Sequence, residues 1–257
     1  MNKKQLITTS ACFILAVVAA QADSIISVNL THASGQAITD PATFGIADLG
    51  TDVGGWNNPV NLYTDANLSY SDGIASTVGF SLTDASGSYY TFNAAYAGTP
   101  LAGGPGVYPA SAGTITFNNL NANFADGYWI IAYIGGYNAA NGGSISDGTD
   151  TYFYRADPAP VNPYGTFVQT TQTTDLGAGA NPIAQYAVFG SSDSLLTSDT
   201  LTLTLATSTG ATGGEAFGGF QIIGAATTVP EPAPMSLALM GSAGLWVLAR
   251  RKSWNQK

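Results

Sequence analysis

Short apolar or alternating runs, each bounded by Gly, Asn, Asp or Pro, follow one another from Ile25 onward, and nowhere does a helical period persist. Leucine and threonine alternate over 200–205, which would place the leucines on one face of a strand and the threonines on the other. The run 128–134 is apolar throughout, as expected of a central strand in a sandwich, although a short helix has the same pattern. These runs predict an all-β domain.

The spacing of the predicted strands, about eight to fifteen residues, favours an antiparallel β-sandwich of jelly-roll type over β-α-β units. The predicted strands cover residues 25–31, 76–84, 89–95, 114–117, 128–134, 151–155, 167–173, 184–189, 200–206 and 217–223. Three Gly-rich stretches are predicted to be loops, at 98–106, 135–148 and 177–179. The sequence has no repeat of fixed period, which argues against a solenoid or a propeller.

Residues 1–22 have the three parts of a secretory signal peptide. Lys3 and Lys4 precede an apolar run at 11–20, and a small-x-small cleavage site at 20–22 follows. The apolar run has about half the length that a membrane-spanning helix needs, so an uncleaved anchor fits less well. Cys12 stands at the start of the run rather than at its end, which disfavours a lipoprotein. We therefore expect export through the Sec translocon.

Three features follow one another at 229–257. A Pro-rich segment that cannot form a helix comes first, and its motif residues are Val229, Pro230, Glu231 and Pro232. An apolar stretch at 235–249 could form a helix of about 22 Å, shorter than the ~30 Å hydrocarbon core of a membrane. A basic tail at 250–257 would stay on the cytoplasmic side, and its cluster is Arg250, Arg251 and Lys252. The order predicts a short transmembrane helix, which a plain tail anchor would also have.

In this order the three features resemble the PEP-CTERM sorting signal of Gram-negative bacteria. The resemblance covers only the tail. It implies recognition by an exosortase, a membrane cysteine transpeptidase-like enzyme, with processing close to the Pro-Glu-Pro motif. It also implies delivery to the cell surface or to the polysaccharide matrix after a transient stay in the inner membrane.

A second resemblance spans most of the chain between the two ends. Residues 26–29, 54–58, 127–136 and 218–223 are similar to segments of a jelly-roll domain of many PEP-CTERM proteins, some relatives of which bind carbohydrate. No single motif here is diagnostic, so the resemblance bears on fold rather than activity. We expect a signal peptide at 1–22, an extracellular β-sandwich at 23–228 and a sorting signal at 229–257.

Charged side chains make up only 9% of the residues, against about 25% in a typical soluble domain. Between Ile25 and Val229 the chain has thirteen Asp and one Glu, but Arg155 is its only Lys or Arg. Such a surface repels phosphate, which argues against nucleic-acid binding and against anionic lipid. The one cysteine, Cys12, lies in the predicted signal peptide, so the mature domain would have no thiol.

Few groups suited to catalysis are present. His32 is the only histidine and lies in a predicted surface turn, so neither a Ser-His-Asp arrangement nor a His-rich metal site is expected. Paired carboxylates could still cleave a glycosidic bond. However, Asp72, Asp126 and Asp147 each precede a Gly, where turn chemistry explains them. We expect no enzymatic activity.

Two binding hypotheses follow from the loops. Loop aromatics can stack on sugar rings, and the candidate glycan contacts are Trp56, Tyr137 and Tyr164, with Tyr63 as a further ring of this kind. The opposite expectation is that these rings are buried. Asp147 and Asp150 could supply oxygen ligands to a structural calcium ion, although their spacing does not match an EF-hand loop and a simple turn explains them better.

Together the sequence predicts a non-catalytic structural or adhesive component of the surface or extracellular matrix of a Gram-negative bacterium, associated with exopolysaccharide. The alternative is a secreted carbohydrate-binding module or a glycan-active enzyme. The expected partners are the Sec translocon, an exosortase-type enzyme and the inner membrane, with polysaccharide as a candidate ligand.

Overall fold

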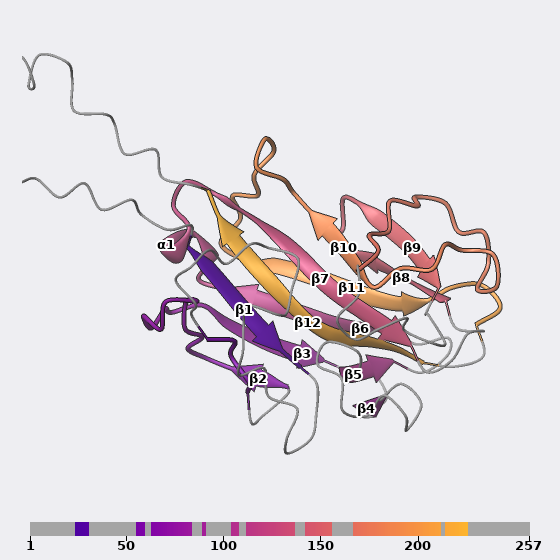
Figure 1. Ribbon diagram of the computed structural model, residues 1–257, viewed down its shortest axis with the longest axis horizontal. Helices are drawn as coiled ribbons and strands as arrows, with labels where there is room; N and C mark the ends of the chain where they lie inside the picture. The colour runs from indigo at the N-terminus through magenta and orange to yellow at the C-terminus, as the bar shows by residue number, and fades with distance from the viewer. Residues whose placement is uncertain are drawn as a thin grey trace, which may run out of the picture. The chain divides into compact units, whose positions relative to one another are not determined.

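Two six-stranded antiparallel sheets pack face to face in the domain (Figure 1). The computed structural model describes residues 24–30, 55–59, 63–83, 89–90, 104–107, 112–136, 142–155, 167–211 and 214–225. These residues belong to a compact unit that spans Ala22–Thr227, whereas the second unit, Met1–Gln21 with Thr228–Lys257, contains none of them. The mostly β composition and the two antiparallel sheets agree with the predicted β-sandwich.

The first sheet, sheet A, has the strand order β10-β7-β12-β5-β4, and β1 also pairs with β12. Its strands are β1 (Ile25–Asn29), β4 (Tyr89–Tyr90), β5 (Gly104–Val107), β7 (Tyr128–Gly136), β10 (Tyr186–Phe189) and β12 (Glu215–Gly224). The apolar run at 128–134 is a strand rather than a helix, and it pairs with β10 on one side and β12 on the other. The prediction of a central strand there is confirmed.

The second sheet, sheet B, has the strand order β2-β3-β6-β11-β8-β9. Its strands are β2 (Thr64–Asp65), β3 (Gly79–Thr83), β6 (Ala112–Asn118), β8 (Gly142–Ser146), β9 (Thr151–Arg155) and β11 (Leu201–Thr207). A single helical turn, α1 (Leu120–Asn123), follows β6 and was not predicted.

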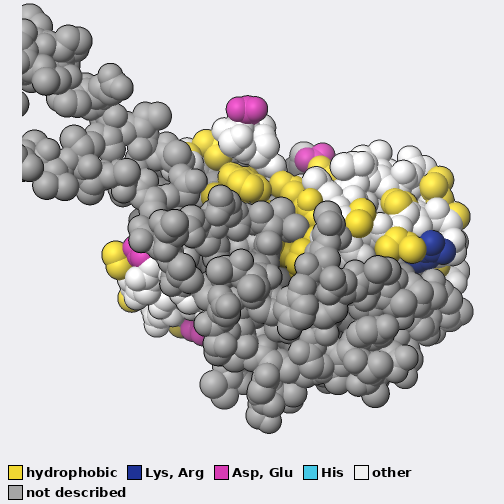
Figure 2. All heavy atoms as spheres, viewed as in Figure 1, with side chains coloured by type: hydrophobic (Ala, Val, Ile, Leu, Met, Phe, Trp, Pro, Cys, Tyr) yellow, Lys and Arg dark blue, Asp and Glu magenta, His cyan; other side chains and the backbone are white. Residues whose placement is uncertain are grey.

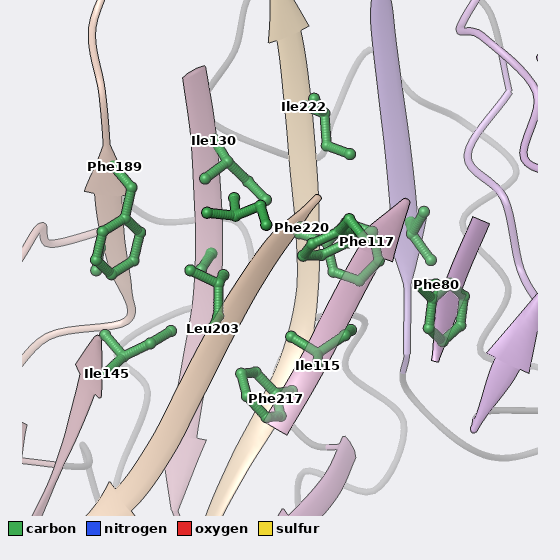
Figure 3. Packing of buried hydrophobic residues seen from close by; sticks show 14 of the residues in the cluster. Phe80, Ile115, Phe117, Ile130, Ile145, Phe189, Leu203, Phe217, Phe220 and Ile222 are labelled. Atoms are coloured by element: carbon green, nitrogen blue, oxygen red, sulfur yellow. The ribbon is translucent and has the colours of Figure 1, made fainter. Parts of the chain in front are cut away.

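The core lies between the two sheets, and aromatic rings join its halves. Phe117 of β6 meets Phe220 of β12 edge to face, with ring centroids 4.5 Å apart, and Phe80 of β3 packs on the same ring (Figure 3). The leucines of the alternating run are buried, as predicted: Leu201, Leu203 and Leu205. The threonines between them therefore point away from the core.

One side of the sandwich is closed by a segment that was predicted to be a strand at 167–173. It forms only single bridges, from Gln169 to Tyr186 and from Gln172 to Phe153. Between them the Thr170 hydroxyl donates to the Phe153 carbonyl at 2.6 Å, while the Thr170 amide donates to the Tyr186 carbonyl at 2.9 Å. The segment is thus divided between β9 of sheet B and β10 of sheet A, which prevents it from joining either sheet as a strand.

Two of the predicted Gly-rich loops contain strand residues: β5 begins within 98–106, and β8 lies within 135–148. Glycine is a weak strand former, which is why these stretches resembled loops. In β8 a glycine is required because neighbouring atoms lie very close. A β-carbon added to Gly142 would lie 2.7 Å from Oγ of Ser208 and 2.8 Å from Cα of Ala178. The third stretch, 177–179, forms no strand, as predicted.

Candidate functional site

The face of sheet B that points away from the core has two rows of hydroxyl side chains in register across the strands. The first row runs over β2, β3, β6 and β11 and consists of Thr64, Ser81, Thr116 and Thr202. The second runs over β3, β6, β11, β8 and β9 and consists of Thr83, Thr114, Thr204, Ser146 and Thr151. Paired residues of adjacent strands share a face, so all nine side chains lie on one surface. We call these nine residues the hydroxyl face.

Neighbouring hydroxyls in the rows bond to one another. The Oγ1 atoms of Thr116 and Thr202 are 3.0 Å apart, and the Thr151 hydroxyl donates to Oγ of Ser146 at 2.9 Å. Ser81, Thr83 and Thr202 are exposed, and the remaining threonines of β6 and β11 are partly exposed. The hydroxyl face is therefore polar and uncharged, and it is built only from short side chains.

The prediction that Trp56 offers an exposed ring for sugar stacking is wrong. Its side chain is 5% exposed and packs beside Tyr133, with ring centroids 6.3 Å apart. The neighbouring Asn57 causes this burial, because its backbone pairs with β1 and its side-chain amide donates to the carbonyls of Ser27 and Ser69. Tyr137 and Tyr164 lie outside the described residues, and Tyr63 is 40% exposed.

Other aromatic rings gather on the outer face of sheet A. Phe167 and Tyr186 contact the buried Tyr133, with ring centroids 5.4 Å and 6.4 Å from it. These two rings and Trp129 are partly buried, and Figure 2 shows hydrophobic side chains at the surface in this part of the molecule. Tyr133 itself donates to Oε1 of Gln221 at 2.6 Å, and Gln221 donates to Ser27 at 3.1 Å. The side chains of Tyr133, Gln221 and Ser27 thus form one chain of hydrogen bonds.

Asp147 and Asp150 form the turn between β8 and β9. Oδ1 of Asp147 accepts the amides of Thr149 at 2.9 Å and of Asp150 at 2.7 Å, and Gly148 has a positive φ of 91°. This geometry agrees with the turn that we favoured over calcium binding. Within the described ranges, no three His, Cys, Asp or Glu side chains are grouped so that they could hold a metal.

Other carboxylates also accept backbone amides. Asp72 accepts the amide of Ile74 at 2.9 Å. Asp175 accepts the amides of Gly177 and Thr209 and the side-chain amide of Asn181. Burial would raise the pKa of Asp175, but these hydrogen bonds outweigh it and lower the pKa. Both carboxylates stabilise turns.

A buried acid that the sequence did not indicate lies between the sheets. Glu215 is fully buried, and burial raises its pKa to about 8, although the Tyr154 hydroxyl acts in the opposite direction. Neither carboxyl oxygen has a hydrogen bond of regular geometry. Its only sequence signal is that it is the one Glu of a domain whose other acids are all Asp. The lack of exposure keeps this carboxyl from contacting a substrate.

The predicted sorting residues lie outside the described residues, which end at 225; they are Val229, Pro230, Glu231, Pro232, Arg250, Arg251 and Lys252. His32 and the predicted signal peptide also lie outside them. In the part of the chain that is described, no helix has the length and apolar character to cross a membrane. No protein-family model, curated protein or solved structure matches this chain.

Proposed function

We propose that this protein is an exported component of the bacterial surface or extracellular matrix, with a non-catalytic structural or adhesive role next to exopolysaccharide. The observation that carries the proposal is the tail, where a Pro-Glu-Pro motif, an apolar stretch and a basic cluster follow one another. In this proposal the tail is a PEP-CTERM sorting signal that enters the inner membrane transiently. An exosortase-type enzyme recognises Pro230, Glu231 and Pro232.

The composition supports export. Lys3 and Lys4 with the apolar run behind them form a Sec signal peptide in this proposal, and Cys12 is removed with it. The mature domain is then free of thiols and depends on its core for stability, which the aromatic packing between the sheets supplies. We also propose that the sandwich has a jelly-roll-like topology.

A non-catalytic role is supported by how the carboxylates are used. Asp72, Asp147 and Asp175 accept backbone amides in turns, and Glu215 is enclosed between the sheets. Cleavage of a glycosidic bond requires two carboxyl groups that face one substrate. The carbohydrate-binding alternative is favoured by a specific feature, the uncharged hydroxyl face of sheet B.

The test is replacement of Pro230, Glu231 and Pro232 by Ala in the native host. We expect the wild-type chain to lose its tail and reach the cell surface, whereas the variant keeps an intact tail in the membrane fraction. Mass spectrometry of the C-terminal peptide gives the readout, and Thr227→Ala with Thr228→Ala is the matched control just before the motif. Unchanged tail processing in the triple variant would refute the sorting proposal.

A further inference from the structure

We propose that the hydroxyl face of sheet B is a binding surface for a neutral polysaccharide, which lies across the strands along the two rows. The inference rests on the proposed function only for the kind of polymer that surrounds the protein. The face itself is defined by the register of β2, β3, β6, β11, β8 and β9.

The register produces a regular array. Neighbouring strands of a sheet are about 4.8 Å apart, and residues two apart on a strand are separated by roughly 6.7 Å. Each row therefore presents a hydroxyl about every 4.8 Å, over four strands in one row and five in the other. A ligand that uses such a row must carry hydrogen-bonding groups at short, repeated intervals, which is the character of a polymer.

The chemistry of the rows matches a polyhydroxylated ligand. A Ser or Thr hydroxyl has one donor and two acceptor positions, so the bond between Thr116 and Thr202 leaves capacity on both oxygens. Sugar hydroxyls have the same double capacity. The threonines are also stiff about χ1 and are held by strands, so little side-chain freedom is lost on binding.

The shape of the surface allows close approach. The next positions along β6, β11 and β8 are occupied by Ala112, Ala206 and Ser144, which are also short, and a large ring, that of Phe153, follows at the β9 edge. No long side chain belongs to either row. A polymer chain can therefore contact several hydroxyls at once, and many weak contacts along one chain add up to a retained complex.

Charge selects between polymers. The rows contain no charged side chain, and the chain between Ile25 and Val229 has fourteen acidic residues against Arg155. A polyanion such as alginate would be repelled by this excess of carboxylates. A neutral glucan meets no such repulsion and finds hydroxyl partners, which is why we assign the surface to a neutral polysaccharide.

The test compares the full chain with a variant of four valines, T114V, T116V, T202V and T204V, in pull-down on amorphous cellulose and in affinity electrophoresis in dextran. Valine keeps the β-branched shape and the strand preference but removes the hydroxyl. We expect retention of the wild-type chain on at least one of the two glucans, and a loss of about tenfold or more in the variant. The matched control, T149V with T197V, removes two exposed hydroxyls outside the rows and should bind like the wild type.

Unchanged retention of the four-valine variant would overturn the proposal, as would wild-type binding to neither glucan or to alginate alone. Adsorption of the wild-type chain to ice crystals without glucan binding would also overturn it. Circular dichroism and thermal unfolding check that the variant is folded, and S81A with T83A on β3 gives a second variant in case it is not. Tail processing is measured separately: its failure with intact glucan binding would count against the sorting proposal alone.

Discussion

Glu215 of β12 lies beside Tyr154 of β9, so that an acid from sheet A meets a phenol from sheet B inside the sandwich. Both side chains are fully buried. Gly143 of β8 makes room for the pair, because an added β-carbon there would lie 2.7 Å from Cγ of Glu215 and 2.9 Å from Oη of Tyr154. Burial and the nearby carboxyl both raise the pKa of Tyr154 well above its usual value.

The buried carboxyl makes stability depend on pH. In the unfolded chain Glu215 titrates near its ordinary value of 4.5, whereas burial raises the pKa to about 8 in the folded protein. The folded state then binds more protons between these values, so the free energy of unfolding falls as the pH rises from about 4.5 to about 8. The two pKa values correspond to a fall of about 5 kcal/mol, and we expect Glu215→Gln to remove most of it in urea unfolding at a series of pH values. Asp193→Asn, at an exposed position, is the control. If the free energy of unfolding of Glu215→Gln fell with pH as much as that of the wild type, Glu215 would not be the cause of the pH dependence.

Gly143→Ala tests the same contact from the other strand. The added methyl would meet Glu215, Tyr154 and the Ala206 carbonyl at less than 3.0 Å. Glu215 lies across the core in sheet A, whereas Tyr154 and Ala206 belong to the strands on either side of β8. We expect a loss of about 1 to 3 kcal/mol in the free energy of unfolding, measured by denaturant titration. Gly179→Ala is the matched control, because nothing lies within 4 Å of its added β-carbon. Equal stability of the two variants would show that β8 can shift without cost.

Alternation predicts which side of a strand is buried, but not what lies next to it. The leucines at 201, 203 and 205 were placed correctly in the core from their two-residue period alone. The hydroxyl face could not be predicted, because it depends on how Thr114, Ser146 and Thr204 are brought into register from distant parts of the chain. Strand pairing is a tertiary property that the local pattern does not contain.

Local composition led to wrong predictions where contacts with distant residues determine the structure. The Gly-rich stretch at 135–148 resembles a loop, yet Gly142 and Gly143 belong to β8 because neighbours approach too closely for a side chain. Trp56 follows two glycines and resembles an exposed loop ring, yet the bonds of Asn57 to β1 bury it. Asp72 and Asp147 were predicted correctly, because an Asp-Gly turn needs only local chemistry.

Asp147 gives a prediction that separates a turn from a metal site. Its Oδ1 atom already accepts two amides across the β8–β9 turn, so calcium is not needed to hold this carboxylate in place. We expect the same melting temperature with calcium and with a chelator, and a loss of about 1 kcal/mol in Asp147→Ala. A higher melting temperature in calcium that disappears in Asp147→Ala would instead support a calcium site at Asp147 and Asp150.

Thr170 should contribute more than other threonines of its segment, because it connects the two sheets. Its buried hydroxyl donates to the Phe153 carbonyl on β9, and its amide donates to the Tyr186 carbonyl beside β7. Thr170→Val keeps the amide and the shape but leaves a buried carbonyl without this donor, which we expect to cost about 1 to 2 kcal/mol. Thr171→Val, at the adjacent exposed position, is the matched control and should change stability by less than about 0.5 kcal/mol.

Hydrogen exchange shows where Thr170→Val loosens the structure. We expect the amides of β9 and β10 to exchange faster than in the wild type, whereas the amides of β3 should be unchanged. Equal effects of the two substitutions would show that the Thr170 hydroxyl does not hold the sheets together.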